Sequence, residues 1–236
     1  MINLRRKLHN LTHPMLGHIL MMHRVVEQRS DNPSQRELEV THDFLEQTIM
    51  DYRQMGYTFV SIDGLLSLLT THHSLCAKKN VCLTFDDGYQ DNYDIAYPLL
   101  KRLEVPFAVY VTTGFIDNRL PMWWYPGEKL GINTESLKML DADPICTIGA
   151  HTISHPRLDI LSLDDQQNEI AHSRQELETI LDHPVHHFSY PHGAYNADTL
   201  TLVKQQSFHT ALCAWGGTVR QGAPPLLLPR IELRQP

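Results

Sequence analysis

The feature that most constrains the fold is the alternation of short apolar runs with longer segments of helical periodicity. The runs read as strands at residues 17–22, 57–60, 81–85, 106–111, 146–150, 187–190 and 210–214. The helical segments lie at residues 41–55, 89–103, 162–181 and 197–206. Such alternation predicts an α/β fold with a parallel sheet, open or closed into a barrel, rather than a β-sandwich.

Local signals mark several boundaries. Thr41 is a good N-cap, and Ser162 with Asp165 three residues later resembles a capping box. The segment 113–143 contains several proline, glycine and aromatic residues. It is therefore expected to be a long loop that covers part of the sheet.

Composition narrows the class of protein. With 236 residues, of which 42% are hydrophobic, the chain is expected to form one domain, 1–236, with residues 1–15 as an N-terminal extension. The net charge of −7 argues against a nucleic-acid partner. No apolar stretch approaches the roughly 18 residues that span a bilayer, and histidines interrupt the basic N-terminus. A soluble, cytoplasmic protein is therefore expected.

Chemically useful residues follow three of the expected strands. Asp86 and Asp87 follow the run 81–85, the segment His-Thr-Ile-Ser-His-Pro follows the run 146–150, and Pro-His-Gly follows the run 187–190. Because loops converge at the carboxyl ends of parallel strands, we expect these side chains to gather on one face.

The spacing of histidines alone cannot identify a metal site. The pattern H-x-x-x-H occurs at His151/His155, but also at His9/His13 and His183/His187. Only the first pair directly follows a strand on the face that carries the aspartates, so position favours it.

Two neutral imidazoles and one carboxylate suit a borderline divalent metal and leave a coordination position for water. The metal would activate that water and polarise a carbonyl oxygen, while the second carboxylate takes a proton. Adjacent residues at a strand end diverge, so Asp86 and Asp87 are expected to have different roles.

The motifs resemble those of the polysaccharide deacetylases of carbohydrate esterase family 4. The matches are Thr-Phe-Asp-Asp-Gly at 84–88, His-x-x-x-His-Pro at 151–156 and Tyr-Pro-His-Gly at 190–193, and with the flanking strands they cover residues 17–233. The resemblance implies a distorted (β/α) barrel with about seven parallel strands. It also implies metal-dependent removal of acetyl groups from an N-acetylated sugar.

The same resemblance implies roles for individual residues. Asp86 is expected to be the general base, and Asp87, His151 and His155 the metal ligands. The backbone N–H of His192 would help to stabilise the oxyanion. Within the third motif, Tyr190, Pro191 and Gly193 are expected at the substrate.

Two departures from the family pattern leave roles open. Phe188 stands where an arginine often holds the general base, and Arg230, near the chain end, is the candidate replacement. The motif that often supplies the general acid is absent, so His23, His192 or His209 must provide the proton, with His192 slightly preferred.

Aromatic residues complete the candidate site. Trp124, in the expected loop, and Trp215, after the last expected strand, could form walls of a sugar pocket, although ordinary packing explains such residues equally well. The sequence thus predicts an N-deacetylase for an oligosaccharide, polysaccharide precursor or glycolipid. The metal is expected to be Zn²⁺, with Co²⁺, Ni²⁺ or Mn²⁺ as alternatives. An amide hydrolase for a non-sugar substrate and a catalytically silent glycan-binding relative remain alternatives.

Overall fold

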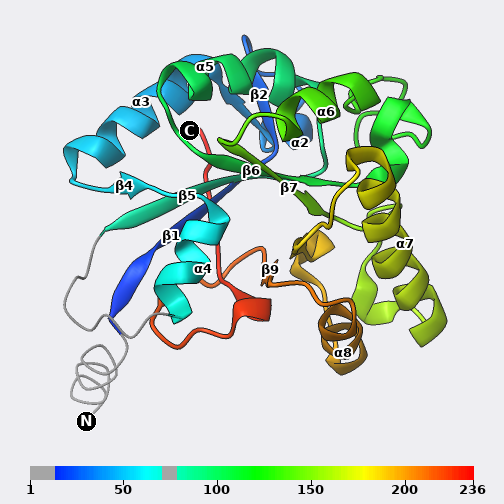
Figure 1. Cartoon of the computed structure of the whole chain (residues 1–236). Coiled ribbons are helices and arrows are strands. Elements are labelled where there is room, and N and C mark those ends of the chain that lie inside the picture. Colours follow the sequence, from blue (N-terminus) through cyan, green and yellow to red (C-terminus); the bar gives the residue numbers. More distant parts are fainter. Residues whose placement is uncertain (1–13, 71–78) are drawn as a thin grey trace.

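The computed structural model describes residues 14–70 and 79–236 and contains one large curled sheet with helices around it (Figure 1). The strands are β1 (Met15–Met22), β2 (Arg24–Val26), β3 (Glu39–Thr41), β4 (Thr58–Phe59), β5 (Asn80–Phe85), β6 (Phe107–Val111), β7 (Cys146–Ala150), β8 (His187–Ser189), β9 (Thr210–Leu212), β10 (Thr218–Arg220) and β11 (Ile231–Glu232). The helices are α2 (Pro33–Arg36), α3 (His42–Gln54), α4 (Ile62–Thr70), α5 (Tyr97–Arg102), α6 (Thr134–Asp141), α7 (Leu163–Leu181) and α8 (Ala197–Gln205).

The large sheet has the order β10-β1-β5-β6-β7-β8-β9, with β4 paired to β5 and β11 paired to β1. All seven strands expected from the sequence exist and pair in parallel. The additional strand β10 is antiparallel to β1. The predicted α/β barrel class is therefore confirmed, with one antiparallel strand that the sequence pattern did not indicate.

The chain end brings the two sides of the curled sheet together. Leu228 bridges to Leu212 of β9, and Ile231 pairs with Leu20 of β1. The segment 228–232 therefore runs between β9 and β1 and closes the sheet into a distorted barrel. Arg230 lies in the middle of this closing segment.

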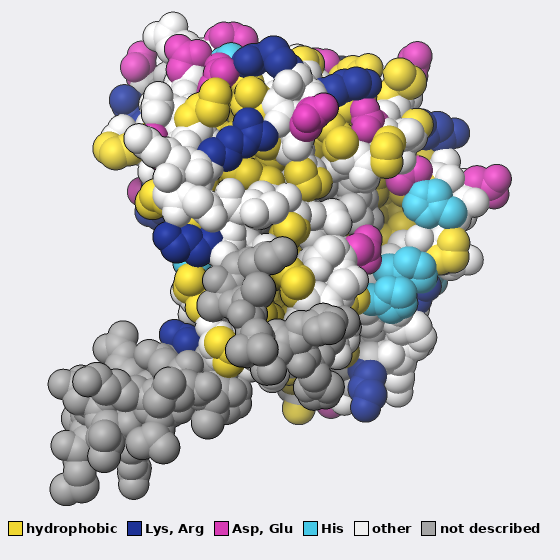
Figure 2. Space-filling model, turned by 60° about the vertical axis from the view of Figure 1, so that its left-hand side comes forward, with side chains coloured by type: hydrophobic (Ala, Val, Ile, Leu, Met, Phe, Trp, Pro, Cys, Tyr) yellow, Lys and Arg dark blue, Asp and Glu magenta, His cyan; other side chains and the backbone are white. Residues whose placement is uncertain are grey.

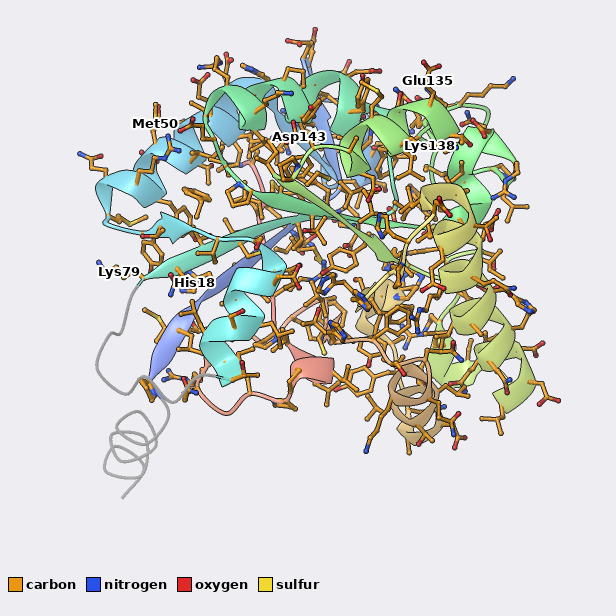
Figure 3. The ribbon with its side chains drawn as sticks, viewed as in Figure 1. His18, Met50, Lys79, Glu135, Lys138 and Asp143 are labelled. Carbon is orange, nitrogen blue, oxygen red and sulfur yellow. The ribbon has the colours of Figure 1, made fainter. Side chains whose placement is uncertain are left out.

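Burial explains why the central strands are nearly continuous apolar runs. Every residue of β5 and of β6 is buried, as expected for parallel strands covered on both faces. Gly149 of β7 allows close packing inside the barrel, because a Cβ there would lie 2.6 Å from the ring of Tyr110. On the outer side, Met50 on α3 and Glu135 and Lys138 on α6 point away from the sheet (Figure 3).

Several boundaries match the sequence analysis. The Thr41 hydroxyl accepts the Phe44 N–H at 3.2 Å and caps α3. Ser162 caps α7 through the Asp165 N–H, but the Asp165 carboxylate accepts from the Ser162 hydroxyl at 2.7 Å rather than from its backbone. The expected capping box is therefore only half formed.

Other expectations were wrong or incomplete. The segment 113–143 is not only a loop, because it contains α6, which starts at an Asn133 cap. The helix expected at 89–103 begins later and combines a π-helical turn, Asn92–Ala96, with α5. Helix α4 and the β2–β3 pair were missed, because their apolar patterns are short. The expected extension at 1–15 overlaps the start of β1, and residues 1–13 lie outside the described residues.

Among the described residues, no helix combines the length and the apolar character needed to cross a bilayer.

Candidate active site

The carboxyl ends of the parallel strands surround a pocket of about 460 Å³. Asp86 and Asp87 enter it after β5, His151 and His155 after β7, and His192 after β8. The pocket is also lined by Met21, His23, Ser34, Glu37, Leu38, Trp123, Trp124, Tyr190, Ala214, Trp215, Arg230, Glu232 and Arg234. The three motifs from separate strands thus meet at one edge of the barrel.

Asp87, His151 and His155 form a cluster that could hold a metal ion. Their ligand atoms all lie within 4.8 Å of one another. Oδ1 of Asp87 is 3.5 Å from Nε2 of His151 and 3.4 Å from Nε2 of His155. This oxygen is buried and has no hydrogen-bond partner among residues 14–70 and 79–236, which is costly unless a cation is bound there. The donor set therefore fits a divalent metal.

The protonation of the two histidines also fits metal binding. Nδ1 of His151 lies 2.8 Å from the Ser189 carbonyl oxygen, so it carries the proton, and the lone pair of Nε2 faces Asp87. Burial is the largest cause that lowers the pKa of His151 to about 4 and that of His155 to about 3. Both rings are therefore neutral near pH 7, as metal coordination requires.

The cluster is held by unusual backbone conformations. Asp87 has φ 74°, Thr152 67°, His155 60° and His192 56°. Non-glycine residues in the left-handed region are strained by about 1–3 kcal/mol each and concentrate at functional sites. The sharp turns place Asp87, His155 and His192 in the lining of the pocket, and the Thr152 hydroxyl accepts from the His155 N–H at 3.2 Å.

Asp86 has a different partner from Asp87. Nη1 of Arg230 donates to Oδ1 of Asp86 at 2.7 Å, and Nη2 donates to Oδ2 at 2.6 Å. Asp86 is 3% exposed and Arg230 is 1% exposed. Arg230 thus contacts Asp86 as predicted, in place of the arginine that is missing at position 188.

The electrostatic environments of the two aspartates differ accordingly. Burial would raise the pKa of Asp86, but the charge of Arg230, followed by that of His151, holds this pKa well below its usual range. For Asp87, burial dominates and raises the pKa. Without metal, only Asp86 has a strong fixed counter-charge.

Two residues that support Asp86 were not found from the sequence. The Ser189 hydroxyl accepts from Nη2 of Arg230 at 2.8 Å and donates to Oδ2 of Asp86 at 3.3 Å. The Thr84 hydroxyl accepts from Nη1 of Arg230 at 3.2 Å. Thr84 lies in the first motif and Ser189 directly precedes the third, but no sequence signal separates them from ordinary strand residues.

The three candidate general acids occupy different places. His23 follows β1, lines the pocket, and has its backbone carbonyl held by the Asn92 amide at 2.9 Å. His192 is exposed and its ring centroid lies 4.5 Å from that of His155. His209 precedes β9 and stacks on His186 at 4.1 Å, away from the pocket. The expectation for His209 was therefore wrong, because a residue before a parallel strand lies at the opposite end of the barrel.

The expected substrate-binding residues divide into pocket walls and supports. Tyr190, Trp124 and Trp215 line the pocket, whereas Pro191 and Gly193 are not among its lining residues. Gly193 has φ 61°, and a Cβ there would lie 2.9 Å from Cβ of Ala214. The glycine therefore allows the segment after β9 to pack close to the third motif.

Within the described part of the chain, the second histidine pair of this spacing, His183 and His187, is not part of a group that could hold a metal ion. His183 contacts Asp141 at 2.8 Å, whereas His187 contacts the Thr210 hydroxyl at 2.8 Å. His183 and His187 lie near the amino ends of β8 and β9, together with His186 and His209. Figure 2 shows histidine side chains close to one another on the face turned toward the viewer. The pair His9/His13 lies outside the described residues.

Comparisons with known proteins agree with this geometry. YxkH of Bacillus subtilis (strain 168), whose name describes it as a polysaccharide deacetylase, is 27% identical to this chain over 215 residues. These residues cover 91% of this chain and 70% of YxkH. The Streptococcus pyogenes deacetylase PplD, solved in complex with acetate, superposes with a TM-score of 0.79 at 27% identity and covers 92% of both chains. IcaB from Ammonifex degensii shares the fold, with a TM-score of 0.81 at 23% identity and coverage of 93% and 92%. The polysaccharide deacetylase family model matches residues 76–211, and the chain belongs to this family.

Proposed function

We propose that this chain is a metal-dependent hydrolase that removes the acetyl group from an acetamido sugar in a glycan. The main support for this proposal is that two adjacent carboxylates have different partners. Asp87 faces two neutral imidazoles, whereas Asp86 is held by Arg230. A site that only binds sugar does not need a second carboxylate beside a metal.

Asp87, His151 and His155 would hold the metal. Bound there, a divalent cation supplies Lewis-acid polarisation of the acetyl carbonyl and lowers the pKa of a bound water. We propose Zn²⁺, because two imidazoles and a carboxylate are among its usual catalytic ligands, with Co²⁺, Ni²⁺ and Mn²⁺ as alternatives.

Asp86 would act as the general base. Its carboxylate takes a proton from the attacking water, and Arg230 fixes its orientation through two parallel hydrogen bonds. A strongly held carboxylate is a weak base, so Asp86 needs a water whose pKa a cation held by the neighbouring Asp87 would lower. Ser189, bonded to both partners, adds to this orientation.

The leaving nitrogen needs a proton to depart as an amine. The imidazoles of His23 and His192 both line the pocket and can deliver it. The backbone N–H of His192 is proposed to stabilise the oxyanion. Separate alanine variants assign the acid: the correct variant loses about 10²-fold or more in turnover while its metal content stays unchanged.

The substrate is proposed to be an N-acetylated glycan. Trp123 and Trp215 line the pocket and are 71% and 67% exposed, so their rings are available to the apolar face of a sugar. PplD was solved in complex with acetate, which is the product expected when an N-acetyl group is removed. This supports the acetyl amide bond as the bond that is cleaved. That the whole chain, 1–236, is one catalytic domain stays a prediction, as does its cytoplasmic location.

Metal analysis coupled to an acetate-release screen tests the proposal. The screen compares N-acetylated oligosaccharides with simple acetamides, before and after chelation of the metal. We expect acetate from the glycans only, lost on chelation and restored by Zn²⁺. Release from the simple amides alone would instead identify another amide hydrolase, and sugar binding without any release would identify a silent relative.

A further inference from the structure

His23 lies at a break between two sheets. It follows β1, whose pairing with β5 ends at Met22 and Phe85, and it precedes β2, which pairs with β3. His23 itself belongs to neither strand. Because a partly buried backbone needs hydrogen-bond partners, contacts from outside these two ladders have to fix its position.

Two neighbouring side chains, Asp91 and Asn92, supply those contacts from the turn that follows β5. The Asn92 side-chain amide donates to the His23 carbonyl oxygen at 2.9 Å. Oδ1 of Asp91 accepts from the Val25 N–H at 3.2 Å, and Oδ2 accepts from Nε of Arg24 at 2.7 Å. Each of the three residues from His23 to Val25 is therefore bonded to one of the two side chains.

Burial makes these contacts difficult to exchange for water. The Asn92 side chain is completely buried, and its amide also lies 3.4 Å from Oδ1 of Asp91. The side chains of Asp91 and Arg24 are 11% and 13% exposed, so their ion pair is largely removed from solvent. Breaking such a pair is costly because either charge would remain desolvated alone. Asn92 also begins a π-helical turn, a feature that is frequent at functional sites.

The segment that is held in this way carries an imidazole into the pocket beside the proposed general base. The Met22 carbonyl oxygen, one residue before His23, accepts from the Asp86 N–H at 2.9 Å. His23 and Asp86 both line the pocket. The backbone of His23 is therefore fixed relative to Asp86 from one side and to Asn92 from the other. His192, the other candidate acid, is exposed.

We propose that Asp91 and Asn92 are positioning residues for His23, which they hold where its imidazole gives a proton to the leaving nitrogen. The inference rests on the proposed deacetylation and takes His23 as the acid. Asp86 takes one proton from the attacking water, whose hydroxyl group stays on the acetyl carbon. The nitrogen takes the electron pair of the breaking C–N bond and the proton of His23, so acetate and an amine are released.

Asn92 is a cleaner probe of this role than Asp91. Through Arg24, Asp91 is also connected to Glu39, which accepts from Nη1 of Arg24 at 3.1 Å, and to the Tyr125 ring, whose centroid lies 4.8 Å from the guanidinium. A change at Asp91 therefore disturbs the β2–β3 pair and an aromatic side chain as well. The amide contact of Asn92 reaches His23 directly.

Two acetyl substrates separate loss of the acid from loss of the whole site. An N-acetylated oligosaccharide needs a proton on its leaving nitrogen, whereas p-nitrophenyl acetate releases a stable phenolate without one. Asn92→Leu keeps roughly the shape of the side chain but loses its N–H groups. We expect it to lose about 10–10²-fold in kcat on the oligosaccharide and much less on the ester, as a displaced acid would. His23→Ala should show the same pattern with a larger loss.

A matched control accounts for the change of charge in this turn. Asp94 lies in the same turn, is exposed and accepts from the Gln90 side-chain amide at 3.0 Å. Asp91→Asn should lower the ratio of amide to ester turnover, and Asp94→Asn should leave it unchanged. An equal loss on both substrates in Asn92→Leu would show a general structural role and overturn the inference. An unchanged ratio in His23→Ala would overturn it as well.

The position of the ring can also be measured without turnover. In protein with isotopically labelled histidines, the NMR signals of the His23 ring are those that disappear in His23→Ala. We expect Asn92→Leu to shift or broaden them, while the signals of His186 and His209, at the opposite end of the barrel, stay in place. Unmoved His23 signals would overturn the inference. If they move but the unaltered protein releases no acetate from any glycan, His23 is positioned as inferred and the proposed deacetylation fails.

Discussion

Replacing Arg230 with alanine should affect stability and turnover together. The substitution removes five hydrogen bonds, to both oxygens of Asp86 and to Thr84, Ser189 and Cys213. It also leaves a buried carboxylate without its counter-charge. Breaking a buried ion pair in this way costs about 3–5 kcal/mol. For a chain of this size, each kcal/mol lowers Tm by about 2–4 °C, so a decrease of roughly 6–20 °C is expected.

The pH dependence of the same variant gives an independent readout. Arg230 holds the pKa of Asp86 below its usual range, so the carboxylate contributes stability above the pKa of an unfolded aspartate, about 3.9, and this contribution is lost as the pH falls. Without Arg230 the pKa of Asp86 rises. The acid limb of kcat/KM should therefore move to higher pH, and turnover near neutrality should fall.

Calorimetry and acetate release across pH check both effects. Arg102→Ala is the control, because it breaks an ion pair with Glu46 at 3.0 Å whose arginine is 55% exposed. Such a surface pair contributes about 0–1 kcal/mol. If Arg230→Ala kept both the Tm and the acid limb of the unaltered protein, Arg230 would neither stabilise nor orient Asp86.

Three further outcomes are expected. The metal-free protein should lose stability as the pH falls from 6.5 toward 4. Burial lowers the pKa of His151 to about 4 in the folded protein, so the histidine is protonated at higher pH in the unfolded chain than in the folded one. A Tm that stays constant over this pH range would contradict this prediction. Trp123→Ala and Trp215→Ala should lower kcat/KM more for long oligosaccharides than for a single acetamido sugar, whereas the exposed control Met139→Ala should not; equal losses on both substrates would argue against sugar contacts. Gly149→Ala should destabilise the barrel by about 1–3 kcal/mol in urea unfolding, because its Cβ would overlap the Tyr110 ring; an unchanged midpoint would show that the ring can move.

The strands and the convergence of motifs could be predicted from the sequence because they depend on local patterns. A carboxylate pair after a buried run must lie at the end of a strand, and parallel strands bring such ends together. The contact between Arg230 and Asp86 was expected from the family resemblance instead, because Phe188 stands where an arginine often holds the general base. Their roles in turnover stay predictions.

The remaining features depend on contacts between distant segments. Ser189 looks like an ordinary residue of a strand, and only the fold brings its hydroxyl group to Asp86. Trp124 was expected to be a pocket wall, but the sequence could not show that its indole N–H donates to the Tyr89 hydroxyl. Short elements such as β2 and β3 were missed because three residues carry too little periodicity.

We propose that Asp86 activates water beside a metal held by Asp87, His151 and His155. The most direct test is acetate release from an N-acetylated oligosaccharide by Asp86→Asn, compared with the unaltered protein at equal, measured metal content. We expect the variant to keep its metal and to lose about 10²-fold or more in kcat. A variant that keeps both its metal and its turnover would contradict it.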